Sequence, residues 1–184
     1  MPLHQTELDG VVVLQPQRHG DARGYFTETF NVKTMADAGL ETVFVQDNES
    51  LSAAVGTVRG IHYQLPPQPQ IKLVRVLQGA VLDVAVDLRS PSPTFGQHVA
   101  VELRAELGNQ LYVPVGFGHA FCTLEPNTIV AYKVSGFYAP DCDRGVRWND
   151  PDLAIDWPIA EADATVSAKD AQAPLFADAV DLFV

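Results

Sequence analysis

Short strand-like segments, separated by glycine and proline, recur along the chain and constrain its fold more than any other feature. They are rich in β-branched and aliphatic residues, which favour strands. They run from Val11 to Leu14, Ile71 to Leu77, Val81 to Leu88, His98 to Leu103 and Ile129 to Val134. Thirteen glycines and thirteen prolines are scattered through the chain, as turns between many short elements require. The sequence therefore predicts one all-β domain over residues 1–184, a sandwich or jelly roll.

Helical patterning is weak by comparison. Asn31 to Ala38 predicts one short helix that ends at Gly39, and the alanine-rich stretch from Glu161 to Ala164 predicts another.

Residues 71–88 predict two paired strands joined by a tight turn at Gln78-Gly79-Ala80. In the first strand, alternation places Lys72 on the same face as Val74 and Val76. If that face is interior, burying the ammonium group is costly without a partner, so a carboxylate or a ligand is expected beside it. Alternation alone also allows this face to be the solvent side.

Composition excludes some classes of function. A formal net charge of −11 argues against a nucleic-acid surface, which needs clustered Lys and Arg. No apolar run is long enough to span a bilayer and no export signal is recognisable, so we expect a cytoplasmic protein that does not bind membranes. Cys122 and Cys142 are accordingly expected to be reduced thiols.

Two histidine-containing segments carry the strongest chemical signal. The first, Gly56 to Gln64, contains Arg59, Gly60 and His62. A lone strand histidine is usually structural. Arg59 and His62 are three residues apart and would face opposite ways on a regular strand, unless Gly60 permits a bulge or Arg59 serves another site.

The second segment, Pro114 to Phe121, has the P-x-G-x-x-H spacing of the second motif of cupin jelly rolls, with His119 at the ligand position. The first cupin motif needs H-x-H and a nearby Glu, but here His62-Tyr63-Gln64 supplies a single imidazole. Metal sites of this type need three or four ligands, so we expect the barrel without a metal. His62 and His119 are then available for proton chemistry or anion binding.

Together with further blocks, these segments closely resemble the dTDP-4-dehydrorhamnose 3,5-epimerase family. The similar blocks are Asp21 to Glu28, Phe44 to Ser50, Gly56 to Gln64, Gln70 to Val74, Ser92 to Gly96, Trp148 to Pro151, Ile155 to Pro158 and Ser167 to Pro174. They cover nearly the whole chain in order. The resemblance implies a cupin-like jelly-roll barrel, an isomerase activity on a dTDP-sugar, no cofactor and a homodimer.

The resemblance also implies roles for matching residues. His62 resembles the proton acceptor, Asp170 its carboxylate partner and Tyr132 the proton donor on the opposite face of the sugar, while Lys72 and His119 match residues that contact the substrate near its ketone and phosphates. Nucleotide- or substrate-binding positions match Arg23, Phe26, Glu28, Gln46, Asp47, Asn48, Arg59, Asp143 and Lys169, and Tyr138 matches the aromatic residue that stacks on thymine.

Two positions depart from the family pattern: Asp143 stands where Glu is usual, and Ala120 replaces a common Gly. The shorter Asp143 side chain puts its contact with the substrate in doubt, but neither change removes a catalytic group.

Three other functions stay open at this stage. An enzyme that inverts only C3 or only C5 of another nucleotide-linked 4-keto sugar would carry the same His62, Tyr132 and Asp170. A metal-dependent cupin enzyme would hold stoichiometric iron, zinc or manganese. A non-catalytic sugar-binding jelly roll would bind nucleotide without any proton exchange.

Overall fold

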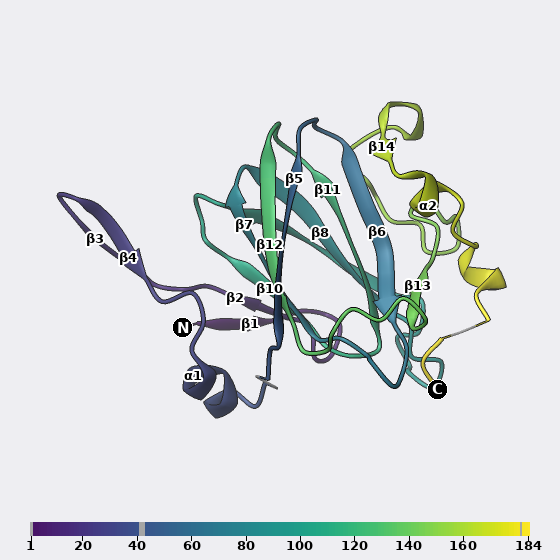
Figure 1. Cartoon of the computed structure of the whole chain (residues 1–184), viewed down its shortest axis with the longest axis horizontal. Helices are drawn as coiled ribbons and strands as arrows, with labels where there is room; N and C mark the ends of the chain where they lie inside the picture. The colour runs from purple at the N-terminus through teal and green to yellow at the C-terminus, as the bar shows by residue number, and fades with distance from the viewer. Residues whose placement is uncertain (1, 41–42, 181) are drawn as a thin grey trace.

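Two mainly antiparallel sheets face each other and form a barrel, seen in the computed structural model of Figure 1, which describes residues 2–40, 43–180 and 182–184. The first sheet has the order β1 (Leu3–Gln5), β2 (Val12–Leu14), β10 (Gln110–Val113), β7 (Lys72–Gln78), β12 (Thr128–Val134) and β5 (Gln46–Ser52). The second has the order β13 (Asp143–Gly145), β6 (Thr57–Gln64), β11 (Phe117–Thr123), β8 (Ala80–Asp87) and β9 (His98–Arg104), with β14 (Thr165–Val166) parallel to β6. The prediction of an all-β jelly-roll barrel is confirmed.

Four short helices complete the described elements. They are α1 (Val32–Asp37), α2 (Ala168–Ala171) and the 3-10 helices η1 (Glu161–Asp163) and η2 (Phe176–Asp178). Helix α1 confirms the prediction for Asn31 to Ala38, because the Asn31 side chain caps the helix by accepting from the backbone N–H groups of Lys33 and Thr34. The stretch from Glu161 to Ala164 forms only the single 3-10 turn of η1.

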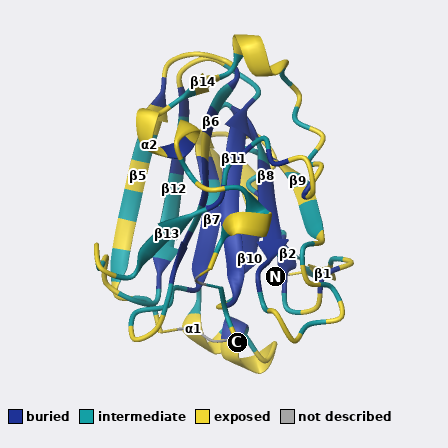
Figure 2. Cartoon of the chain, turned by 90° about the vertical axis from the view of Figure 1, so that its right-hand side faces the viewer, coloured by how far each residue is buried: buried dark blue, intermediate teal, exposed yellow. Residues whose placement is uncertain are grey.

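The main core fills the barrel interior between the two sheets. It contains Val74 and Val76 of β7, Val81 and Ala85 of β8, and Phe121 of β11, all at most 5% exposed. A second core lies on the outer face of the second sheet, where Ile61, Val84 and Leu88 pack under the chain from about residue 146 onward. Figure 2 shows the result, with β6, β8 and β11 mostly buried and β5 alternating between intermediate and exposed residues.

The predicted pairing of residues 71–77 with residues 81–88 is wrong. Strand β7 pairs with β10 and β12, whereas β8 pairs with β9 and β11 in the other sheet. Gly79, with φ +77°, turns the chain from one sheet to the other, and a Cβ there would lie 2.3 Å from Thr128 Oγ1. A tight turn at this glycine could join two paired strands of one sheet or carry the chain from one sheet to the other. The second arrangement is found, because β7 and β8 are each buried in a different sheet.

A separate two-stranded hairpin, β3 (Arg18–Asp21) and β4 (Gly24–Thr27), projects away from the barrel in Figure 1. Arg18 anchors its base by donating to the backbone carbonyls of Ala105 and Glu106 and by lying 4.2 Å from the Tyr25 ring centroid. Phe26 lies opposite His19 on this hairpin and is 72% exposed.

Two further predictions concern cysteine and membranes. Cys122 and Cys142 are both free thiols, as predicted. No helix in the described ranges is long and apolar enough to cross a bilayer.

Candidate active site

The residues of interest meet in a cavity of about 230 Å³ at one end of the barrel. Both sheets line it, because His62 and Asp143 come from the second sheet while Lys72 and Tyr132 come from the first. The complete lining is Gln46, Asn48, His62, Tyr63, Gln64, Gln70, Lys72, Tyr132, Tyr138, Asp143 and Lys169. The structure thus brings together eight of the residues that the sequence singled out, from segments more than a hundred residues apart.

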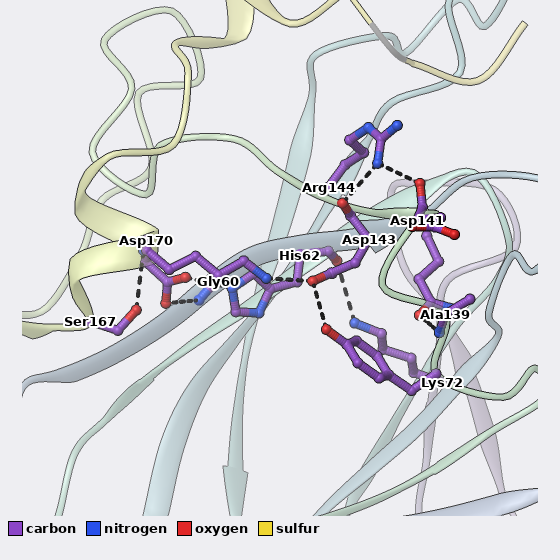
Figure 3. Close-up of polar contacts among 12 residues, drawn as sticks. Gly60, His62, Lys72, Ala139, Asp141, Asp143, Arg144, Ser167 and Asp170 are labelled. Atoms are coloured by element: carbon purple, nitrogen blue, oxygen red, sulfur yellow. Dashed lines mark hydrogen bonds and ion pairs between the residues drawn. The ribbon is translucent and has the colours of Figure 1, made fainter.

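His62 and Asp170 form a histidine–carboxylate pair in the site (Figure 3). His62 Nε2 lies 2.6 Å from Asp170 Oδ1, and the Asp170 side chain is only 5% exposed. Burial alone would raise the pKa of Asp170. Hydrogen bonds with His62, the Gly60 N–H and Ser167 outweigh this effect, so the pKa of Asp170 is lowered. An ionised carboxylate only accepts hydrogen bonds, so Nε2 carries the proton and Nδ1 of a neutral His62 keeps a lone pair. That lone pair is what a general base needs.

A β-bulge at Gly60 decides which way His62 points. His119 of β11 lies opposite His62, while Phe121 lies opposite Arg59, so Gly60 and Ile61 of β6 together oppose the single residue Ala120 of β11. Gly60 has φ +123°, and a Cβ there would lie 2.6 Å from the Ala120 side chain. A bulge at Gly60 was one of the two explanations that the Arg59–His62 spacing left open, and it is present. Only glycine fits it without displacing β11.

Lys72 lies inside the barrel, which settles the question that alternation left open. Its side chain is buried on the same face as Val74 and Val76, and Nζ donates to the His62 carbonyl oxygen at 3.3 Å. Burial lowers the pKa of Lys72 to about 8, although the negative charges of Asp83 and Asp143 act in the opposite direction. The ammonium form therefore predominates at neutral pH, and a carboxylate does stand near it, as the sequence led us to expect.

His119 lies beneath the cavity and has its own carboxylate partner, Asp83, at 2.8 Å. Burial lowers the pKa of His119 more strongly than Asp83 raises it. Asp83 was not among the predicted site residues. In the sequence, Asp83 and Ala85 are two residues apart and so share one face of a strand. This pattern points to a site residue only once that face is known to be interior.

Tyr132 faces the cavity from β12, in the sheet opposite His62. Burial raises the pKa of Tyr132, and the positive charge of Arg59 offsets part of this rise. Its phenol therefore stays protonated at neutral pH, so it can donate a proton from the side of the cavity facing His62.

The mouth of the cavity is formed by Tyr138, Asp143 and Lys169. Tyr138 is 58% exposed, with its hydroxyl 3.4 Å from Asp143 Oδ2, and Lys169 forms an ion pair with the same carboxylate. Gln46 accepts from the Tyr138 N–H and donates to Asn48, which connects strand β5 to this mouth. An exposed ring next to cationic and amide groups is suited to holding a nucleotide.

Several predicted site residues lie elsewhere in the single chain. Asp47 alternates with Gln46 and Asn48, so its side chain is on the outer face of the sheet, paired with Lys133 at 2.8 Å. Arg59 donates to Ser52 Oγ and to the Leu51 carbonyl beyond the cavity lining. The remaining three, Arg23, Phe26 and Glu28, lie on or just after the projecting hairpin.

The described ranges hold no group of three or more His, Cys, Asp or Glu side chains placed to bind a metal ion. The two histidines of the site are each committed to one carboxylate instead, His62 to Asp170 and His119 to Asp83.

Comparison with known proteins identifies the family of this chain. A family model described as dTDP-4-dehydrorhamnose 3,5-epimerase matches residues 5–178. A relative of that name from Sinorhizobium fredii is 49% identical over 168 residues, covering 89% of this chain and 84% of its own length.

Solved structures agree in fold as well as in sequence. The Bacillus anthracis enzyme of that name, solved with TDP and PPi bound, is 48% identical with a TM-score of 0.91, covering 95% of this chain and 98% of its own. A Legionella pneumophila dTDP-6-deoxy-D-glucose-3,5-epimerase, in complex with dTDP-4-keto-L-rhamnose, is 43% identical with a TM-score of 0.92 and covers 98% and 94% of the two chains. With a matching family model over nearly its whole length and a relative 49% identical, this chain belongs to the dTDP-4-dehydrorhamnose 3,5-epimerase family.

Proposed function

We propose that this chain converts dTDP-4-keto-6-deoxy-D-glucose to dTDP-4-keto-L-rhamnose, as an isomerase in which His62 is the base and Tyr132 the acid. The observation that carries the proposal is the placement of His62–Asp170 and Tyr132 on facing sheets, with Lys72 between them in the same cavity. Family membership supports the reaction, and this geometry supports the roles of the residues.

The chemistry follows from the ketone. C3 and C5 both neighbour the C4 carbonyl, so removal of either proton leaves an enolate whose charge is delocalised onto the C4 oxygen. His62 Nδ1 takes the proton and becomes an imidazolium ion, which the buried Asp170 carboxylate stabilises. No oxidation state changes, so the reaction needs no redox partner.

Two further groups complete the inversion at each carbon. The Lys72 ammonium group donates a hydrogen bond to the developing C4 oxyanion in a buried, low-dielectric position, where such stabilisation is strongest. Tyr132 then delivers a proton to the opposite face of the carbon, so its configuration is inverted. The exposed Tyr138 ring stacks on the thymine, while Lys169 contributes positive charge near the phosphates.

Solvent exchange tests this function directly. In heavy water the protein is expected to introduce deuterium at both C3 and C5 of the keto-sugar, detected by NMR, because each carbon is deprotonated and reprotonated. The matched control is dTDP-glucose, which lacks the ketone and is expected to show no exchange. Label at one carbon only would mean a mono-epimerase, and the absence of label would leave a sugar-binding protein without this activity.

We further propose that the active form is a homodimer in which the projecting hairpin of one copy reaches the cavity of the other. Arg23, Phe26 and Glu28 match nucleotide-binding positions, yet they lie on or beside β3–β4, away from the cavity of their own chain. The 72% exposed Phe26 ring and a two-stranded hairpin are both unfavourable in water without a partner surface.

Localisation in the cytoplasm remains a prediction of the sequence.

Mixing two inactive variants tests the shared site. Arg23→Ala is expected to disable the hairpin and His62→Ala the cavity, so each pure dimer has little activity. A hybrid dimer would keep one site with both elements intact, so refolding the two together is expected to restore up to about a quarter of wild-type activity. If the mixture stays as inactive as its components, each site is built within one chain.

A further inference from the structure

Asp83 is a fully buried carboxylate inside the barrel that the proposed reaction does not yet use. Its exposure is 0%, and it lies on the interior face of β8 with Val81 and Ala85. Oδ1 is 2.8 Å from His119 Nε2, whereas Oδ2 is buried without a hydrogen-bond partner among the described residues. An interior carboxylate with an unsatisfied oxygen is costly to the fold, so its presence calls for a role.

The strand register explains why Asp83 meets His119. Asp83 lies opposite Phe121 of β11, and His119 is two residues away on the same face, which makes the two a diagonal cross-strand pair. On its other side His119 lies opposite His62 of β6. Two histidine–carboxylate pairs therefore lie next to each other, His119–Asp83 across β8 and β11, and His62–Asp170 between β6 and α2.

The contact with Asp83 determines the proton positions on His119. A carboxylate only accepts hydrogen bonds, so Nε2–H donates to Asp83. Burial, with smaller effects of Lys72 and His62, lowers the pKa of His119 despite the opposing charge of Asp83, so the ring is neutral at pH 7. Its Nδ1 then carries a lone pair, which accepts a hydrogen bond from a sugar hydroxyl rather than donating one to the C4 oxyanion.

Asp83 also acts on Lys72. The groups around the ammonium from neighbouring strands are Asp83 of β8, Asp143 of β13, His62 of β6, His119 of β11 and Tyr132 of β12. Of these, the two carboxylates favour the charged amine, and the effect of Asp83 is the larger. Asp143 is in addition paired with Lys169 at the cavity mouth, whereas Asp83 is wholly enclosed with the amine.

We propose that Asp83 is a positioning residue of this active site, which holds His119 as the neutral Nε2–H tautomer and supplies the buried negative charge that keeps Lys72 protonated. The inference rests on the proposed function, because it assigns the cationic stabilisation of the enolate to Lys72 and hydroxyl binding to His119. It makes one carboxylate responsible for the protonation state of two substrate-contacting groups.

The first test needs no substrate and no variant of Asp83. Nitrogen-15 NMR of histidine-labelled wild-type protein is expected to show His119 protonated at Nε2 and unprotonated at Nδ1 from pH 6 to 8. The signal is assigned by its loss in His119→Gln. An Nδ1–H tautomer, or an imidazolium ion at neutral pH, would overturn the proposal.

The second test is the pH profile of kcat in Asp83→Asn. In the wild type, turnover should fall as pH rises through the pKa of Lys72, at about 8, because the active amine is the protonated form. Asparagine has no charge to stabilise the ammonium. The fall of kcat on the alkaline side of the profile, called here the alkaline limb, is therefore expected to occur about one pH unit lower. Asp83→Glu keeps the charge and should leave the limb near its wild-type position.

Asp87→Asn is the matched control. Asp87 is an equally buried carboxylate four residues along the same strand, but it binds Arg89, Ser92 and Thr94. Its loss should affect stability without moving the limb. A folded Asp83→Asn protein with an unshifted limb would refute the proposal. If the wild type shows no turnover, the proposed function fails, while the NMR measurement still decides the role of Asp83.

Discussion

Replacing His62 by alanine is expected to lower deuterium exchange at both C3 and C5 by about 10²–10⁴-fold, the usual contribution of a positioned general base. The same Nδ1 lone pair serves both carbons in the proposed reaction, so both rates should fall together. The measurement is NMR of the keto-sugar nucleotide in heavy water with wild-type and variant protein at equal concentration. Circular dichroism and thermal unfolding check that the barrel is intact.

His98→Ala provides the matched control. His98 begins β9 at the edge of the second sheet, outside the cavity lining. Burial lowers the pKa of His98, and a hydrogen bond with the Leu153 backbone offsets part of this. Its removal should leave exchange at both carbons unchanged. Exchange that persists at one carbon in His62→Ala would show that a different base serves that carbon.

Replacing Lys72 by methionine is expected to lower kcat by about 10²–10³-fold, comparable to the loss of one oxyanion donor elsewhere. Methionine has nearly the same length and suits the face shared with Val74 and Val76, so the loss should come from the missing charge. Because the oxyanion exists only after proton removal, KM should change far less than kcat. Steady-state kinetics at pH 7 separate the two parameters.

Lys33→Met is the control for this substitution. Lys33 lies on α1 at the surface, in an ion pair with Asp37, and both side chains are more than half exposed. We expect no change in kcat or KM. A Lys72→Met protein whose defect lies wholly in KM would show that Lys72 binds the ground state rather than the enolate.

Much of the site could be predicted from the sequence, because its chemistry is carried by residue types in short segments. Alternation correctly grouped Lys72 with Val74 and Val76, and the three-residue spacing of Arg59 and His62 offered a bulge at Gly60 as one of two explanations. The helix at Asn31 to Ala38 was predicted from the glycine that follows it, Gly39. These features depend on neighbours within a few positions, which the sequence displays directly.

The errors and omissions arise where distant segments meet. Residues 71–88 look like a hairpin, yet β7 and β8 separate into different sheets at Gly79. Asp83 escaped notice because nothing local marks its face of β8 as interior. The sequence pattern also could not predict that the Asp47 side chain points outward or that Phe26 lies on a projecting hairpin.

By itself the sequence predicted an all-β barrel from its strand-like segments. Its resemblance to a family supplied the family and the candidate base, acid and cation, because these are read from residue types in short segments. Only the tertiary structure decided which strands pair, which face of β8 is buried and that Asp83 meets His119. The physical reason is that period-two alternation limits a strand to two faces but does not choose between them. That choice is made by the apolar surface buried when both sheets and the C-terminal segment pack together.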